Sequence, residues 1–195
     1  MINYKLATYH IILASGSPRR QQFFNELGLD FEIRLKPVDE SYPDRLRHFE
    51  ISDYLAQLKS LPFKNELQDK EILITSDTIV WHNQKALGKP KDAQEAFDML
   101  SSMSGTTHEV ITSICFTTPT TQKTVNAVTK VTFKVLTEDE INHYITTYQP
   151  FDKAGAYGIQ EWIGQIGIVN IEGSYTNVVG LPTHLLYKTL NSMVQ

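Results

Sequence analysis

The chain has 195 residues, of which 41% are hydrophobic and 21% are charged, and its formal net charge is −4 at pH 7. This length and balance are typical of an ordinary globular protein, and we expect a single domain over residues 1–195. The acidic net charge argues against general nucleic-acid binding, which needs a basic face, so a polyanionic ligand would require a local basic pocket.

The first predicted elements are a short strand and a helix joined by a tight turn. The apolar run Ile11 to Ala14 predicts the strand, and Ser15 to Pro18 predicts the turn. Ser17 is a favourable N-cap and Pro18 a favourable first helical residue, so the sequence marks the helix start clearly. Gly28 is expected to end the helix.

Two arginines, Arg19 and Arg20, occupy the first turn of this helix, where the helix dipole repels cations. The arrangement makes sense if an anion binds there. Backbone N–H groups, the hydroxyls of Ser15 and Ser17 and two guanidinium groups would then converge on a phosphate. The alternative is a pair of exposed arginines matched with Glu26 or with an acidic loop.

Strands and helices then alternate at short spacing, as hydrophobic periodicity and turn residues indicate. In chain order we expect a strand over Phe31 to Leu35, a loop over Pro37 to Asp44, a helix with the stripe Ile51, Leu55 and Leu58, a strand over Ile72 to Trp81, a helix capped by Asp92, a hairpin of Val110 to Phe116 with Thr124 to Leu136, and a helix with the capping box Thr137 and Glu140. The long hairpin is incompatible with a purely parallel sheet, so the class is α/β with a mixed sheet.

The last third of the chain is rich in glycine. It holds six of the ten glycines: Gly155, Gly158, Gly164, Gly167, Gly173 and Gly180. This density, around a short predicted strand over Ile166 to Ile171, indicates tight turns or a close approach of the backbone to a ligand. A closing helix is expected after Leu181 and Pro182.

Asp77 is the best catalytic candidate on physical grounds. With Thr75 and Ser76 it interrupts an otherwise apolar strand, and a buried carboxylate is costly unless it is paired or coordinates a metal. The alternative is a solvated turn, Ser76 to Thr78, between two short strands. The local sequence favours neither.

Two further carboxylates, Asp39 and Glu40, lie in the predicted loop. Oxygen ligands suit Mg²⁺ or Mn²⁺ alongside substrate phosphates, so this pair could add a second carboxylate to that of Asp77. Acidic loop residues are mostly solvated, and a solvated pair is the alternative.

Three lysines are candidates for anion contacts. Lys89 precedes a helix N-terminus, an unfavourable place for a cation without an anion nearby. Lys153 opens a glycine-containing segment whose N–H groups could approach a ligand, and Gln160 in that segment offers an amide able to contact a base edge. Lys59 lies on the helix flank opposite the apolar stripe, where the pattern predicts a solvated lysine.

Cysteine content and hydropathy bear on the compartment. The single Cys115, expected to be a buried apolar filler, excludes an internal disulfide framework and a cysteine-based zinc cluster. No run approaches 18 apolar residues, and Met1 to His10 lacks the pattern of a signal peptide. We therefore expect a cytoplasmic protein that does not enter a membrane.

Five segments in a fixed order carry a resemblance to a known family. They are Ser15 to Arg20, Ser76 to Val80, Gly88 to Pro90, Asp152 to Gln160 and Gly173 to Pro182. Together they closely resemble the Maf family of nucleoside triphosphate pyrophosphatases, from Ile11 to Leu190. Each segment alone is a weak motif, whereas the five in order are very specific.

The resemblance implies a two-lobed α/β fold around a central mixed sheet, similar to inosine triphosphate pyrophosphatases and often homodimeric. It implies hydrolysis, dependent on Mg²⁺ or Mn²⁺, of a nucleoside triphosphate to the monophosphate and pyrophosphate, as a house-cleaning step of nucleotide metabolism. A water activated by Asp77 or by the metal would attack the α-phosphorus.

The resemblance also assigns roles to individual positions. Asp77 matches the proton acceptor, and Glu40 and Asp77 match the carboxylates near the metal. The positions tied to substrate choice are Arg19, Thr78 and Gln160. The polar or cationic residues that face the triphosphate are Ser15, Ser17, Arg20, Lys59, Lys89 and Lys153.

The segments around Asp77 and Gln160 look like the branch of the family that prefers dTTP and UTP, so the expected substrates are these or modified pyrimidine nucleotides. Ser76 stands where alanine is usual, and Glu161 to Ile163 replaces a small glycine-containing segment beside the presumed base pocket. Two alternatives are a nucleotidyltransferase, whose phosphate loop Leu13 to Arg19 partly echoes, and a nucleotide-binding regulator of cell division with little catalysis.

Overall fold

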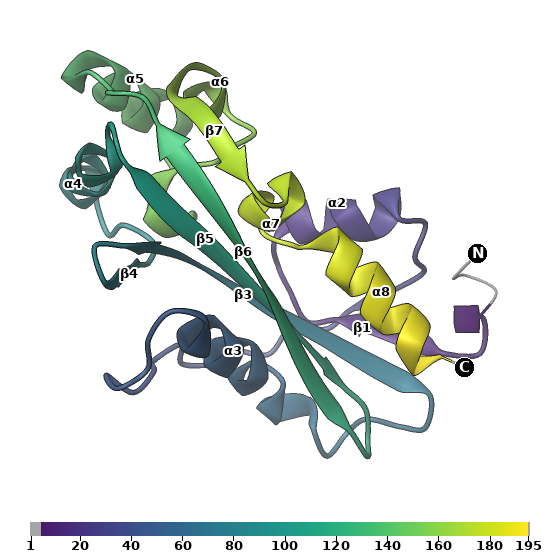
Figure 1. Ribbon diagram of the computed structural model, residues 1–195. Coiled ribbons are helices and arrows are strands. Elements are labelled where there is room, and N and C mark those ends of the chain that lie inside the picture. Colours follow the sequence, from purple (N-terminus) through teal and green to yellow (C-terminus); the bar gives the residue numbers. More distant parts are fainter. Residues whose placement is uncertain (1–4, 195) are drawn as a thin grey trace.

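The computed structural model describes residues 5–194, and this part of the chain forms one mixed sheet flanked by helices (Figure 1). The strands are β1 (His10–Leu13), β2 (Glu32–Ile33), β3 (Glu71–His82), β4 (Lys85–Leu87), β5 (Thr107–Thr117), β6 (Gln122–Phe133) and β7 (Ile168–Glu172). The helices are α2 (Pro18–Glu26), α3 (Phe49–Leu58), α4 (Ala93–Met103), α5 (Glu138–Tyr148), α6 (Trp162–Gly167), α7 (Tyr175–Val179) and α8 (Thr183–Met193), with 3₁₀ turns at Leu61–Phe63 and Ala154–Ala156.

The sheet joins a parallel part to an antiparallel part. Its order is β2-β1-β3-β5-β6-β7, with β4 pairing β3. β1 runs parallel to β2 and β3, whereas in the series β3, β5, β6 and β7 each strand is antiparallel to the next. The β5–β6 hairpin pairs along its whole length, from Thr107 opposite Thr132 to Thr117 opposite Gln122. The predicted mixed sheet is confirmed.

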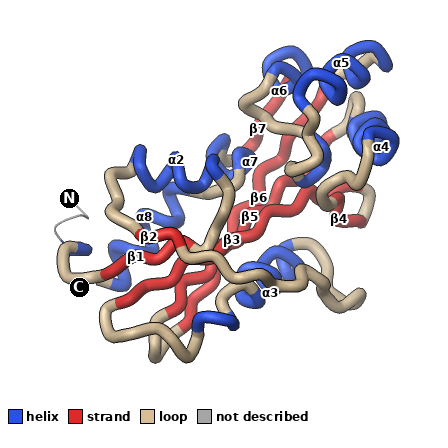
Figure 2. The backbone as a smooth tube through the Cα atoms, turned by 180° about the vertical axis from the view of Figure 1, so that it is seen from behind, coloured by secondary structure: helices blue, strands red, loops and turns tan. Residues whose placement is uncertain are grey.

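Two separate hydrophobic clusters give the molecule its two lobes. One cluster packs α2 and α8 against β1 and the start of β3, around Phe24, Phe116 and Leu186. The other packs α4 and α5 against the opposite ends of β5 and β6, around Leu100 and Tyr144. The long strands β3, β5 and β6 connect these lobes, and α3 covers the other face of the sheet between them (Figure 2).

Most predicted helix boundaries are confirmed by their caps. Ser17 caps α2 by accepting from the Arg20 N–H, and Pro18 is the first helical residue. Asp92 caps α4, and Thr137 with Glu140 forms the reciprocal capping box of α5. These local signals need no tertiary context, because each satisfies N–H groups that the first helical turn leaves open.

Of the two alternatives at Asp77, the structure shows the continuous strand and not the solvated turn. Thr75, Ser76 and Asp77 continue one 12-residue strand, so Asp77 does not lie in a solvated turn. Neighbours satisfy two of these polar residues: the Thr75 hydroxyl donates to Ala56 O at 2.6 Å, and Asp77 accepts from Lys59 at 2.7 Å. The buried Ser76 hydroxyl has no hydrogen-bond partner within the described residues.

The other differences are small. β2 spans two residues, Glu32–Ile33, instead of Phe31 to Leu35, and the last strand lies at Ile168–Glu172. β4, α6 and α7 are absent from the expectation because segments of three to six residues show no full hydrophobic period. Cys115 is fully buried, as expected. Every helix in the described part is too short or too polar to span a bilayer.

A buried histidine makes stability depend on pH. His108 lies near the start of β5, with Nε2 at 2.7 Å from the Tyr157 hydroxyl, and burial with the nearby His82 lowers its pKa to about 3. In the unfolded chain this imidazole is therefore protonated below about pH 6.5, whereas in the folded chain it is protonated only near pH 3. As the pH falls from 6.5 toward 3, the free energy of unfolding should drop by about 1.4 kcal/mol per pH unit from this group.

Urea unfolding of the wild type and of His108→Phe at several pH values between 6.5 and 4 isolates this contribution. The difference in free energy between the two proteins should shrink as the pH falls, since the variant lacks the group. Parallel curves for the two proteins would show that His108 is not the source.

Candidate active site

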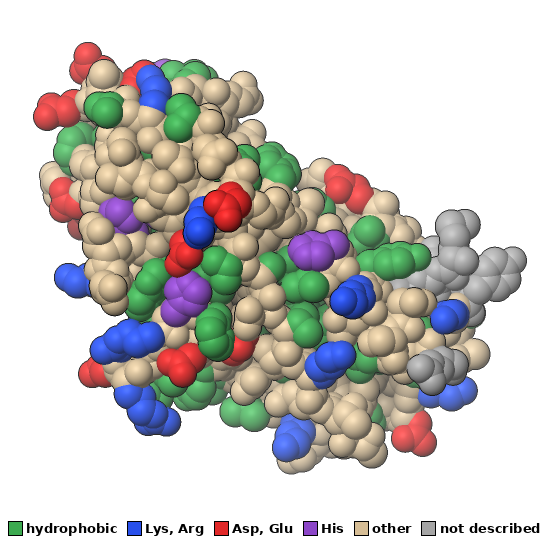
Figure 3. Space-filling view, in the orientation of Figure 1, with side chains coloured by type: hydrophobic (Ala, Val, Ile, Leu, Met, Phe, Trp, Pro, Cys, Tyr) green, Lys and Arg blue, Asp and Glu red, His purple; other side chains and the backbone are tan. Residues whose placement is uncertain are grey.

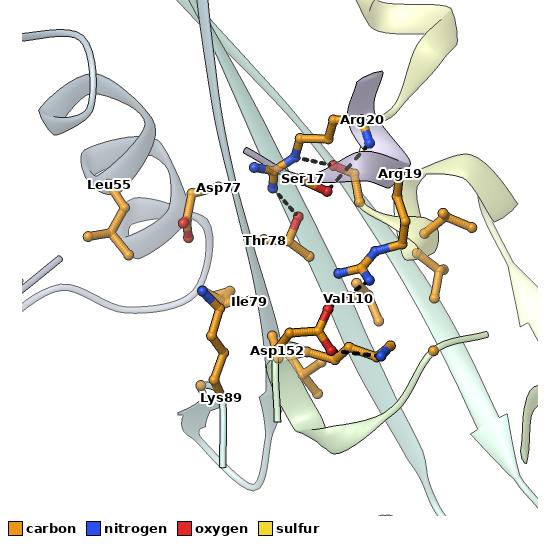
Figure 4. A pocket seen from close by; sticks show the side chains of 18 of the residues that line it. Ser17, Arg19, Arg20, Leu55, Asp77, Thr78, Ile79, Lys89, Val110 and Asp152 are labelled. Carbon is orange, nitrogen blue, oxygen red and sulfur yellow. Dashed lines mark hydrogen bonds and ion pairs between the residues drawn. The ribbon is translucent and has the colours of Figure 1, made fainter. Parts of the chain in front are cut away.

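Two adjoining cavities lie between the lobes, with volumes of about 290 and 400 Å³. Pockets for small ligands are of this order or somewhat larger. The residues that line both cavities are Ser17, Arg19, Arg20, Glu40, Lys59, Lys89 and Asp152. The first cavity continues along an apolar wall that includes Leu55, Ile79, Val110 and Val178 (Figure 4). The second continues under the 14–18 turn and reaches Lys36.

Asp77 lies in the middle of β3 and lines the first cavity, next to Ser76 and Lys59, which line the second. Its side chain is 9% exposed, and its Oδ1 accepts from Lys59 Nζ at 2.7 Å. Burial raises the pKa of Asp77, while the Lys59 ammonium opposes that rise. Lys59 also lies 3.2 Å from the exposed Glu40 carboxylate, so one ammonium group joins the two carboxylates.

The prediction of a solvated Lys59 from the helical pattern is wrong. Lys59 follows α3 directly, and its side chain is only 18% exposed because it turns back onto β3. A helical-wheel projection does not predict the orientation of a side chain at the end of a helix, because that orientation depends on the segment that follows. Lys59 lines both cavities, and the phosphate contact that the family resemblance implies for it stays a prediction.

Arg20 is held by the protein on all sides. Its guanidinium donates to Gly180 O and Ser76 O, each at 2.9 Å, and to the hydroxyls of Thr78 at 3.1 Å and Ser15 at 3.4 Å. These bonds use four of its five N–H donors. Burial lowers the pKa of Arg20, and the charge of Asp77 opposes this. Arg20 therefore ties α2 to β3 and to the end of α7, and it brings a positive charge to the cavities.

Arg19, the other member of the pair, reaches across the cleft. Its guanidinium contacts Asp152 at 3.0 Å, and Asp152 also accepts from Lys153 at 2.7 Å. Burial by itself would raise the pKa of Asp152, but the hydrogen bonds from Lys153 and Arg19 hold that pKa below its usual range. Asp152 thus holds the charged groups of Arg19 and Lys153 close together beside the first cavity. Figure 4 shows Arg19 and Asp152 approaching each other from different elements.

The hydroxyl groups at the site are also engaged. Ser15 is buried, and its Oγ accepts from the Ser17 N–H at 3.3 Å. Thr78 accepts from Arg20 and bonds Thr112 at 2.9 Å; because the Thr112 hydroxyl donates to Asn177 O, Thr78 is the donor in that pair. Ser15 and Ser17 shape the turn, and Thr78 forms the floor between the lobes.

Two of the predicted site residues, Lys89 and Gln160, are exposed at the rim of the first cavity. Lys89 follows β4 and points toward the space in front of Asp77 (Figure 4). It precedes α4 as predicted, although Asp92 caps that helix. Gln160 is exposed and lines the first cavity near the apolar wall. All eleven predicted site residues thus lie around the two cavities, and their roles toward a ligand stay predictions.

Sequence reasoning missed three charged residues of the site. Lys36, which lines the second cavity, is bonded to Glu66 and to Pro62 O, and it looked like an ordinary loop lysine. Asp152 and Glu161 flank the 153–160 segment, and both carboxylates contact Lys153. The only signal available was the presence of acids at both ends of a segment that begins with a lysine.

The carboxylates suit a divalent metal only in part. In residues 5–194 no group of three or more His, Cys, Asp or Glu side chains could hold an ion unaided. Glu40 and Asp77 converge on the same ammonium group, so they face a common point. Mg²⁺ is commonly bound by one or two carboxylates together with substrate phosphates. The donor set therefore fits a metal that arrives with a phosphate ligand.

On one face of the molecule, lysine and arginine side chains are scattered together with acidic ones (Figure 3). A local group of cations facing two carboxylates, at the junction of a polar and a partly apolar cavity, can bind a phosphorylated ligand with an apolar end. Fold and site thus define the class: an α/β protein with a cation-lined cleft between two lobes.

Comparison with known proteins identifies the family. The family model described as Maf-like protein matches residues 10–193, and the chain belongs to this family. It is 60% identical to a dTTP/UTP pyrophosphatase of Flavobacterium johnsoniae over the full length of both chains. It is 58% identical to a dTTP/UTP pyrophosphatase of Christiangramia forsetii, covering all of this chain and 99% of that one.

One solved structure supports the fold alone. The Staphylococcus aureus Ham1 protein matches with a TM-score of 0.52 at 17% identity, covering 92% of this chain and 99% of that one. At this identity the match speaks for the shared architecture, and function has to be argued from the site.

Proposed function

We propose that this protein hydrolyses dTTP and UTP, or modified pyrimidine nucleoside triphosphates, to the monophosphate and pyrophosphate. The observation that carries the proposal is Asp77, a buried carboxylate that lines the first cavity and contacts Lys59, which lines both cavities. Relatives named dTTP/UTP pyrophosphatase, at 58–60% identity over the whole chain, support the choice of substrate.

The two cavities suggest how the substrate lies. The base and sugar occupy the first cavity, against Ile79 and Val110 and near Gln160. The β- and γ-phosphates extend into the second cavity, toward the 14–18 turn and Lys36. The α-phosphate then lies at the border, beside Asp77 and Lys59. Arg19, Lys89 and Lys153 neutralise the triphosphate, and Asp152, which contacts both Arg19 and Lys153, gives way to phosphate oxygens.

Asp77 acts as the general base. Burial raises the pKa of its carboxyl group, and a base is most effective when its pKa approaches the working pH. In the free protein Lys59 opposes this rise. Asp77 then takes a proton from a water that attacks the α-phosphorus, and pyrophosphate leaves.

We further propose Mg²⁺ or Mn²⁺ as the cofactor, held by Asp77 and Glu40 together with phosphate oxygens. When bound, such an ion supplies charge neutralisation at the reacting phosphate. The protein's own part is to position the triphosphate and to stabilise the charge that develops on it.

The function is tested by incubating the purified protein with a panel of standard and modified triphosphates plus Mg²⁺ or Mn²⁺. Monophosphate and pyrophosphate should appear together, fastest from dTTP and UTP. Diphosphate with orthophosphate would refute the proposal. Pyrophosphate release that requires a sugar phosphate would indicate a nucleotidyltransferase, and tight binding without turnover would indicate a nucleotide-binding regulator.

Two further expectations belong to this proposal: a homodimer and a cytoplasmic location. Both rest on the family resemblance and on composition. Sedimentation of the purified protein and fractionation of cells test them separately from the activity.

A further inference from the structure

Lys153 differs from the other site lysines in having two carboxylate partners on its own side of the cleft. Its side chain is 10% exposed, and its Nζ lies 2.7 Å from Asp152 and 3.2 Å from Glu161. The two acids differ in exposure: the Asp152 side chain is 60% exposed and the Glu161 side chain is 20% exposed. Asp152 also contacts Arg19 across the cleft, whereas Glu161 faces the interior of its own lobe.

Glu161 is anchored from behind by Tyr144. This tyrosine of α5 is fully buried, and its hydroxyl accepts from the Gly158 N–H at 3.0 Å. Since that lone pair is engaged by a donor, the phenolic proton points to the Glu161 Oε2 atom, to which Tyr144 donates. Burial and the bond to Glu161 raise the pKa of Tyr144, so the hydroxyl stays protonated and remains a donor.

The turn before Glu161 is shaped around this carboxylate. The Glu161 N–H donates to Gly158 O at 3.0 Å, which closes the turn that carries Gln160. A Cβ added to Gly158 would lie 2.9 Å from the Glu161 Cδ atom, so only glycine leaves room for the carboxylate here. The Glu161 carboxylate therefore packs closely against the turn that lines the first cavity.

We propose that Glu161 is a positioning residue of the active site: it holds the Lys153 ammonium toward the triphosphate, and with Tyr144 it fixes the turn that carries Gln160. This inference rests on the proposed function. When phosphate oxygens displace the exposed Asp152 from Lys153, the buried Glu161 keeps the ammonium in place. Glu161 acts through Lys153 and does not touch the substrate.

A double-mutant cycle tests this route. Glu161→Gln keeps an acceptor for Tyr144 and removes the charge that faces Lys153. We expect kcat/KM for dTTP to fall about tenfold, mainly through KM, because Lys153 contacts the triphosphate before and during the reaction. In a Lys153→Met background the same substitution should change kcat/KM by less than about twofold, since the contact is already lost.

Glu172→Gln is the matched control. Glu172 is an exposed β7 residue with a long 3.7 Å contact to Lys130, and its replacement should leave kcat/KM unchanged. Tyr144→Phe is a second variant for the case that Glu161→Gln folds poorly: it should lower kcat/KM for dTTP, and Glu161→Gln should add little to it. Thermal unfolding of each variant separates a folding defect from a defect in positioning.

Two results would overturn the inference. One is a Glu161→Gln variant that matches Glu172→Gln. The other is a loss that persists undiminished without Lys153, which would show a purely structural role. Wild-type protein inactive on every triphosphate would refute the proposed function instead. The cycle can then be repeated by calorimetry of dTTP binding in EDTA, which needs no turnover.

Discussion

Replacing Asp77 by asparagine is expected to lower kcat for dTTP by at least ~10²-fold, the size typical of the loss of a general base. Asparagine keeps the shape of the side chain and can still accept a hydrogen bond from Lys59, which now lies 2.7 Å from the carboxylate. Folding should therefore be retained. The phosphate-binding cations are unchanged, so the variant should still bind dTTP in a thermal-shift measurement.

Asp69→Asn is the matched control for this substitution. Asp69 is exposed in the turn before β3, and its replacement should leave kcat unchanged. Near-normal turnover in Asp77→Asn would remove Asp77 from the role of base. A similar loss in the Asp69 variant would show that the assay reports general damage to the fold.

Replacing Arg20 by methionine is expected to cost about 3 kcal/mol of stability, because the backbone carbonyls of Ser76 and Gly180 lose a charged donor. For a chain of this length the midpoint of thermal unfolding should fall by about 6–12 °C. Arg19→Met is the internal comparison. Its ion pair to the exposed Asp152 is worth at most about 1 kcal/mol, so the midpoint should hardly move.

The two arginine variants therefore separate two roles that the sequence presents as one pair. Arg19→Met should lower kcat/KM for dTTP at nearly unchanged stability, whereas Arg20→Met should lower both. Kinetics and differential scanning calorimetry on the two proteins test this. Equal midpoints would show that the four hydrogen bonds of Arg20 contribute little to the fold.

Much of the fold could be predicted from signals between residues close together in the sequence. The caps at Ser17, Asp92 and Thr137 were predictable because each involves neighbours within one helical turn. The β5–β6 hairpin followed from strand pattern and a short turn. The two-lobed arrangement came from the family resemblance, since nothing local specifies that two hydrophobic clusters form at opposite ends of one sheet.

The site was predictable to a different extent. Asp77 stood out because a carboxylate in an apolar strand has to be compensated, but its partner Lys59 lies 18 positions earlier and did not follow from the pattern. Arg19 and Asp152, which contact each other, are 133 positions apart in the sequence. The role of Glu161 follows only from its hydrogen bond with Tyr144. Such pairings arise from tertiary structure, and single-sequence periodicity carries no information about them.

The central claim is that water attacks the α-phosphorus beside Asp77. Hydrolysis of dTTP in ¹⁸O-labelled water, followed by mass spectrometry of both products, tests it most directly. The account predicts one ¹⁸O atom in dTMP and unlabelled pyrophosphate. Label in pyrophosphate, or formation of dTDP and labelled orthophosphate, would place the attack on another phosphorus and contradict the account.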